Sequence, residues 1–77
     1  MDVIRDIVMP IVKIANKSNV EKVEYEAAED RVKIWIFMEP NENVMKQITI
    51  KQYDLIRRHG IGIEIVVVEV NKLSGDR

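Results

Sequence analysis

The first apolar stretch of the chain repeats every three to four residues, which is the spacing of one face of a helix. It predicts an amphipathic helix over about residues 2–17. Pro10 lies inside this segment, and an interior proline removes a backbone hydrogen bond and usually kinks a helix. We therefore expect a kink or a break at Met9 and an end at the polar run 16–19. The apolar positions are Val3, Ile4, Ile7, Val8, Ile11, Val12, Ile14 and Ala15.

Two alternating stretches follow, over residues 20–27 and 31–39, and they predict the strands of a hairpin. One face of the second strand carries Val32, Ile34, Ile36 and Met38, and the other face carries Trp35 and Phe37. A turn over residues 27–30 would place opposite charges, or a lysine and an aromatic ring, across the strands on one face. Such pairs stabilise a hairpin by about 0.2–1 kcal/mol each. The expected pairs are Glu26 with Arg31, Glu24 with Lys33, Lys22 with Trp35, Tyr25 with Val32 and Val23 with Ile34.

Residues 44–50 fit two structures. As a strand they have Val44, Ile48 and Ile50 on one face, and the run Ile48-Thr49-Ile50 is β-branched, which disfavours a helix interior. Thr49 and Gln52 also have the spacing of a capping box, so a short helix would begin at Thr49. As a helix, the segment places five apolar residues on about a third of the circumference, namely Val44, Met45, Ile48, Leu55 and Ile56. We favour the strand and keep one long helix over 41–59 as the alternative.

The remaining elements are clearer. Residues 51–60 form the end of a helix, since Gly60 is a good left-handed C-cap. Residues 61–70 form a last strand with apolar side chains on both faces, and residues 71–77 form a flexible tail. The predicted fold is α+β, a two-layer sandwich of one domain over residues 1–70, with the order α-β-β-β-α-β and a mainly antiparallel sheet. The alternative order is α-β-β-α-β.

Composition narrows the class of protein. A chain of 77 residues is marginally stable alone, and without cysteine it has no disulfide or thiolate metal site. The 12 Ile and 11 Val against 2 Leu, with 32% charged residues of both signs, suit a thermophile. No apolar run approaches the ~20 residues that span a bilayer. We expect a cytoplasmic protein that contacts no membrane.

Catalytic chemistry has little support in this sequence. His59 falls at a helix end, and Ser18 and Ser74 have no oriented base, so a nucleophilic mechanism lacks its parts. The carboxylates near residues 24–30 are typical of a solvated hairpin. No phosphate-binding glycine motif occurs in the sequence. We expect no enzyme activity, no catalytic residue, no metal site and no cofactor.

The outer face of the predicted sheet is the candidate site. Apolar side chains of the hairpin and of the last strand should gather there, and a large apolar patch usually marks an interface. A two-fold homodimer or a small oligomer would cover it; the alternative is that the N-terminal helix covers it. The candidate interface residues are Trp35, Phe37, Val66, Val68 and Val70.

A small nucleic-acid-binding protein is the alternative function. Aromatic residues on a sheet can stack exposed bases, and residues 44–60, with four basic residues and one acidic residue, have a net charge of +3. Residues 20–43 oppose this, since three basic and seven acidic residues give −4. The candidate contacts are Lys33, Lys46, Arg57 and Arg58.

In element order alone, the five-element alternative resembles type II KH RNA-binding domains, the cytoplasmic domains of cation diffusion facilitators and the ring-building domains of secretion systems. The KH G-x-x-G loop is absent, because the glycines of "HGIG" are residues 60 and 62. The facilitators' metal ligands have no counterpart beyond a lone histidine. The resemblance transfers no functional residue to this chain.

Overall fold

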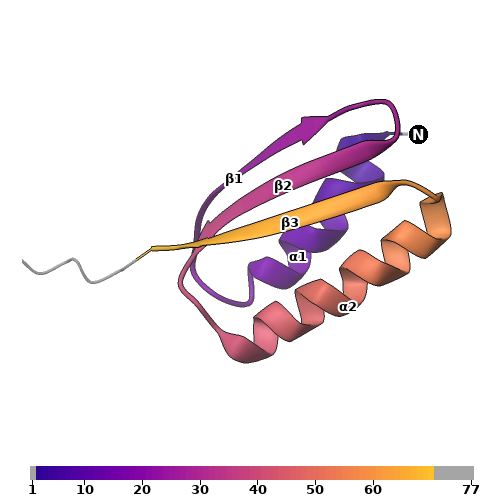
Figure 1. Cartoon of the computed structure of the whole chain (residues 1–77). Helices are drawn as coiled ribbons and strands as arrows, with labels where there is room; N and C mark the ends of the chain where they lie inside the picture. Colours follow the sequence, from indigo (N-terminus) through magenta and orange to yellow (C-terminus); the bar gives the residue numbers. More distant parts are fainter. Residues whose placement is uncertain (1, 71–77) are drawn as a thin grey trace, which may run out of the picture.

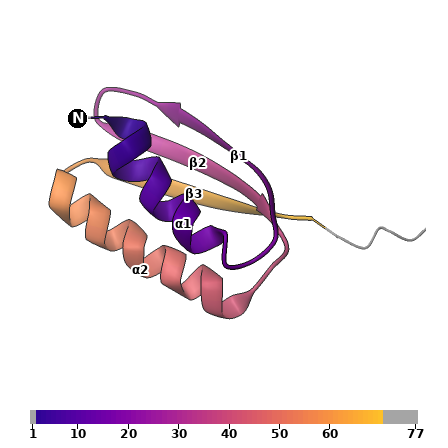
Figure 2. The same cartoon turned by 180° about the vertical axis from the view of Figure 1, so that it is seen from behind.

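The computed structural model describes residues 2–70 and has a small α+β fold with two helical segments and a three-stranded mixed sheet (Figure 1). The order along the chain is helix, strand, strand, helix, strand. Both helices lie on the same side of the sheet, as the view from behind shows (Figure 2). The expected tail at 71–77 lies outside the described residues.

The first helical segment changes geometry where Pro10 predicts a disturbance. A π-helical turn, η1 (Ile4–Val8), leads directly into α1 (Met9–Ala15), which has Pro10 at its start. The backbone N–H of Met9 donates to the carbonyl of Ile4, five residues back. This wider turn suits a proline, because the proline ring would clash with a carbonyl of the preceding turn in a regular α-helix. The chain therefore stays helical through Pro10 instead of breaking.

The hydrophobic core lies between the helices and one face of the sheet. Strand β2 (Arg31–Met38) is central, and its four inward side chains are at most 1% exposed. The helices contribute side chains at helical spacing, so each helix buries one stripe. The core consists of Ile7, Val8, Ile11 and Ala15 from η1 and α1, Val32, Ile34, Ile36 and Met38 from β2, Val44, Ile48 and Leu55 from the second helix, and Ile63 from the last strand.

The predicted hairpin forms, but its register differs from the expected one by two residues. β1 (Val20–Ala27) pairs antiparallel with β2, and Val23 lies opposite Ile36 instead of Ile34. Since side chains alternate with a period of two, a slip of two residues keeps every side chain on its predicted face. The pairing pattern therefore could not decide between the registers. The turn decides it, because the N–H of Ala28 donates to the carbonyl of Arg31 and closes a shorter loop than the expected turn over residues 27–30.

The strand predicted at 44–50 is wrong. One helix, α2 (Glu42–His59), spans this segment and agrees with the five-element alternative. Asn41 is the N-cap and its side chain accepts from the N–H of Val44, whereas Thr49, the expected cap, lies inside the helix. Ile48 is 2% exposed and Ile50 is 68% exposed, although a strand would place them on one face. Burial at helical spacing thus prevails over the β-branched propensity of residues 48–50.

The prediction of a mainly antiparallel sheet is also wrong. It depended on the strand predicted at residues 44–50, which the structure does not form. The strand order is β1-β2-β3, and β3 (Gly62–Glu69) pairs parallel with β2. A helix as long as α2 is the usual connection between adjacent parallel strands. Gly60 ends α2 in the left-handed conformation at φ 68°, which a glycine adopts without steric cost, and this expectation is confirmed.

Candidate functional site

The outer face of the sheet, opposite the helices, brings the predicted interface residues together. Trp35 of β2 pairs with Val66 of β3, and Phe37 pairs with Val68 in the next row. Val70 follows β3, and its N–H donates to the carbonyl of Met38, so the ladder continues by one residue. We call the side chains of Trp35, Phe37, Val66 and Val68 the outer patch. All four are half-buried, and Val70 is half-buried as well.

The alternative in which the N-terminal helix covers this face does not hold. η1 and α1 bury Ile7 and Ile11 against the inner side chains of β2, on the other side of the sheet. Every buried side chain of β2 occupies an alternate position from Val32 to Met38, and the positions between them remain half-buried. Neither helix therefore lies over Trp35 or Phe37.

Charged side chains surround the outer patch and neutralise one another. The ammonium of Lys22 lies 4.7 Å from the centre of the Phe37 ring and 3.3 Å from the carboxylate of Glu24. The ammonium of Lys33 lies 5.1 Å from the Trp35 ring and 3.8 Å from the carboxylate of Glu64. Each aromatic ring thus has a lysine over it, and each of these lysines has a carboxylate partner. Exposed pairs of this kind stabilise a protein by about 0–1 kcal/mol. They therefore determine the charge around the outer patch and add little to the stability of the fold.

The structure does not bring the candidate nucleic-acid residues into one surface. Lys33 lies on the outer face of the sheet, and the other three lie on α2, behind the opposite face. Arg58 donates to the carboxylate of Asp54 at 3.1 Å. Lys46 and Arg57 are exposed on the helix. The four cations therefore form no common patch.

One hollow adjoins the outer face at the end where β3 begins. It has a volume of about 660 Å³ and is lined by the β1–β2 turn and by charged residues of both signs. Its charged lining residues are Glu26, Arg31, Lys33 and Glu64. Within residues 2–70, no group of three or more histidine or acidic side chains is placed to hold a metal ion. No helix in the same range is long and apolar enough to cross a membrane.

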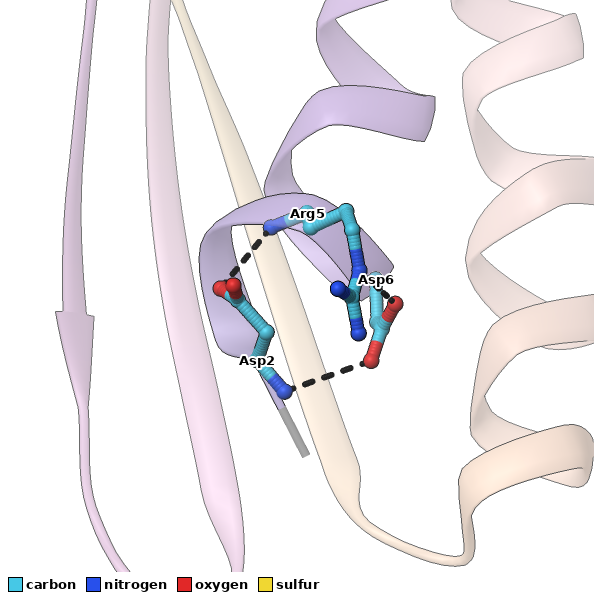
Figure 3. A network of polar contacts seen from close by, with 3 residues as sticks. All are labelled: Asp2, Arg5 and Asp6. Atoms are coloured by element: carbon cyan, nitrogen blue, oxygen red, sulfur yellow. Dashed lines mark hydrogen bonds and ion pairs between the residues drawn. The ribbon is translucent and has the colours of Figure 1, made fainter.

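A second polar cluster, which the sequence analysis missed, lies at the start of η1 (Figure 3). The carboxylate of Asp6 accepts from the Arg5 side chain at 3.1 Å and from the N–H of Asp2 at 3.2 Å. The carboxylate of Asp2 accepts from the N–H of Arg5 at 3.2 Å. These bonds use backbone donors that a helix start leaves unpaired. The i, i+4 spacing of Asp2 and Asp6 was the available signal.

This cluster predicts a pH dependence for the first turn. The hydrogen bond from Arg5 lowers the pKa of Asp6, and partial burial of the carboxyl opposes this effect. Because the pKa of Asp6 is lower in the folded state, its ionised carboxylate contributes fully to stability above the ordinary carboxyl pKa of about 3.9. This contribution is lost as pH falls through the lower pKa of the folded state. An NMR titration should give Asp6 a pKa below the ordinary range in the wild type and a higher pKa in Arg5→Gln. An unchanged Asp6 pKa in Arg5→Gln would contradict the assigned cause.

Comparisons with protein-family models, with curated proteins and with solved structures give no match to this chain.

Proposed function

We propose that this protein is a small non-enzymatic interaction module that forms a homodimer or a small homo-oligomer through the outer face of its sheet. One observation carries the proposal: both helices pack on the inner face, and within residues 2–70 no helix covers the outer patch. An apolar patch of this kind is uncommon on a free monomer and usually marks an interface.

The surroundings of the outer patch fit a protein partner. Interfaces have an apolar centre, often with tryptophan, and a polar rim. Trp35 and Phe37 lie on the central strand, and Lys22, Glu24, Lys33 and Glu64 lie around them. A rim with both signs of charge is self-complementary, because a two-fold axis can bring a lysine of one copy to a glutamate of the other. A second copy of this chain is therefore the occupant that we propose.

The same rim disfavours nucleic acid as the partner of this face. Binding to phosphates requires lysines or arginines that are free to replace counterions. Lys22 and Lys33, the lysines over the aromatic rings, each have a carboxylate within 4 Å. A role as an assembly or regulatory subunit fits an interaction module of this kind. The cytoplasmic location of the protein remains a prediction.

Sedimentation of Trp35→Glu/Phe37→Glu tests the proposal. Both positions lie on the outer face of β2, away from the buried core. Two carboxylates in an apolar contact should raise the dissociation constant at least thirty-fold, since the loss of even one aromatic anchor costs about 2 kcal/mol or more. We expect the wild type to be associated at micromolar concentration and the variant to have a lower mass with unchanged circular dichroism.

Ile50→Glu is the matched control. It introduces a carboxylate in place of an apolar side chain that is 68% exposed on α2, on the helical side of the molecule. Its mass should equal that of the wild type. A wild type that stays monomeric across micromolar concentrations, or a double variant that keeps the full mass, would refute self-association through this face.

A further inference from the structure

The two edges of the sheet differ in how they are protected against pairing with another strand. β1 has a bulge between Val20 and Lys22, and charged side chains alternate along it. Bulges and charges are the devices by which natural sheets block edge pairing. β3 pairs with β2 in an unbroken register, contains no lysine and no proline, and has β-branched residues at positions 65–68. The β3 edge therefore lacks the bulge of β1, and its charged residues, Glu64 and Glu69, leave positions 65–68 between them without a charge.

The hydrogen bonds at the two ends of β3 show which backbone groups face this open edge. The N–H of Gly62 donates to the carbonyl of Asp30 at 3.0 Å, and the N–H of Val70 donates to the carbonyl of Met38 at 3.1 Å. Backbone groups alternate in direction along a strand, so the even-numbered residues bond to β2. The N–H and carbonyl groups of Ile65, Val67 and Glu69 consequently point away from the sheet.

A side chain of α2 closes one end of the open edge. The amide of Gln52 donates to the carbonyl of Ile63 at 2.6 Å. An incoming strand could not bond at Ile63 without displacing this contact. Residues at helical spacing from Gln52 share its side of α2, and among them Met45 and Ile56 are half-buried apolar residues. They offer an apolar support beside the edge.

We propose that β3 pairs antiparallel with β3 of a second copy, across a two-fold axis at Val67, so that the two sheets become one continuous sheet. This surface is the strand edge, and the inference does not depend on the proposed contact of the outer face. Val67 of each copy would exchange both backbone bonds with its equivalent, and Ile65 would do so with Glu69 of the other copy. This gives about six new hydrogen bonds.

The register at Val67 follows from three features of the strand. It uses the backbone groups of Ile65, Val67 and Glu69 and leaves the bond between Gln52 and Ile63 intact. It keeps odd positions opposite odd positions, as the alternation of faces requires. It also places no glutamate opposite a glutamate: Val66 lies opposite Val68, so the outer patches of both copies meet across the joint. A strand that is complementary to itself in this way has a second copy as its best partner.

Val67→Pro is the direct test, with Val67→Ala as its control. Proline is tolerated on an edge strand where the N–H faces solvent, and the N–H of Val67 faces away from β2. Val67→Pro should therefore keep the ladder to β2 and the circular dichroism of the wild type, while sedimentation shows half the wild-type mass. Val67→Ala keeps the edge N–H and should keep the mass. A folded Val67→Pro with the full mass would overturn the proposal.

Variants with a single introduced cysteine test the geometry even if Val67→Pro does not fold. The chain contains no cysteine, so any disulfide between copies must involve the introduced one. Cysteines at position 67 would lie opposite each other with Cα atoms about 5.5 Å apart, within the range that a disulfide spans. Val67→Cys should form a covalent dimer under mild oxidation. Tyr25→Cys, exposed on β1 at the far edge, should not. Equal cross-linking of both variants would overturn the proposal.

Together with Trp35→Glu/Phe37→Glu, these variants separate the two contacts. A mass that falls only in Val67→Pro supports the edge and refutes the outer-face contact. A mass that falls only in Trp35→Glu/Phe37→Glu supports the outer-face contact and refutes the edge. A partial fall in each variant from a wild-type tetramer supports both contacts, and a monomeric wild type refutes both.

Discussion

Ile36→Ala is expected to lower the free energy of unfolding by about 2–5 kcal/mol, because it leaves a cavity that the surrounding structure fills only in part. Ile36 is 0% exposed on the central strand, opposite Val23 and Val67 of the two neighbouring strands. A domain has about 0.05–0.15 kcal/mol of stability per residue, so this loss is a large fraction of the total. Urea unfolding, read as a shift of the midpoint at constant slope, measures it.

Ile50→Ala is the control for this loss. It deletes the same atoms from a side chain that is 68% exposed, where little apolar surface is removed from water. Its effect should stay within about 0.5 kcal/mol. If both variants lost the same amount, Ile36 would not lie in the core, and the assignment of an inner and an outer face to β2 would fail.

The faces of the strands could be predicted from the sequence for a physical reason. Alternation in residues 31–38 places Ile34 and Ile36 on one side and Trp35 and Phe37 on the other, whatever the neighbours are. The helices then bury the purely apolar side, and this is what the structure shows. The candidate interface residues share a face for the same reason. Whether that face binds a partner depends on chemistry outside the chain and stays a prediction.

The register and the strand pairing could not be predicted in the same way. A hairpin slipped by two residues keeps the same faces, so the pattern of charges and apolar residues is almost equally satisfied. Only the bond between Ala28 and Arg31, which depends on the conformation of the turn, separates the two registers. The parallel pairing of β3 depends on α2 being one helix, and so it could not be known while residues 44–50 were ambiguous.

The ambiguity of residues 44–50 had a physical cause. The segment is β-branched, so its local propensity favours a strand by a few tenths of a kcal/mol per residue. A helix over Glu42–His59 buries Val44, Ile48 and Leu55 on one stripe. Burying each of these side chains contributes about 1.5–3 kcal/mol, which exceeds the sum of the local preferences. The bond of Gln52 to Ile63 had no sequence signal, because it depends on how α2 lies beside β3.

Thr49→Pro and Thr49→Ala together test the continuity of α2. Thr49 is exposed in the middle of the helix, where its hydroxyl donates to the carbonyl of Met45. Proline there removes a backbone bond and clashes with the preceding turn, so unfolding should become easier by about 3 kcal/mol or more. Alanine has the higher helix propensity and should stabilise the protein by a few tenths of a kcal/mol. In a strand, the same alanine would be destabilising. Urea unfolding of both variants therefore gives a sign as well as a magnitude, and a destabilising Thr49→Ala would contradict a helix through residue 49.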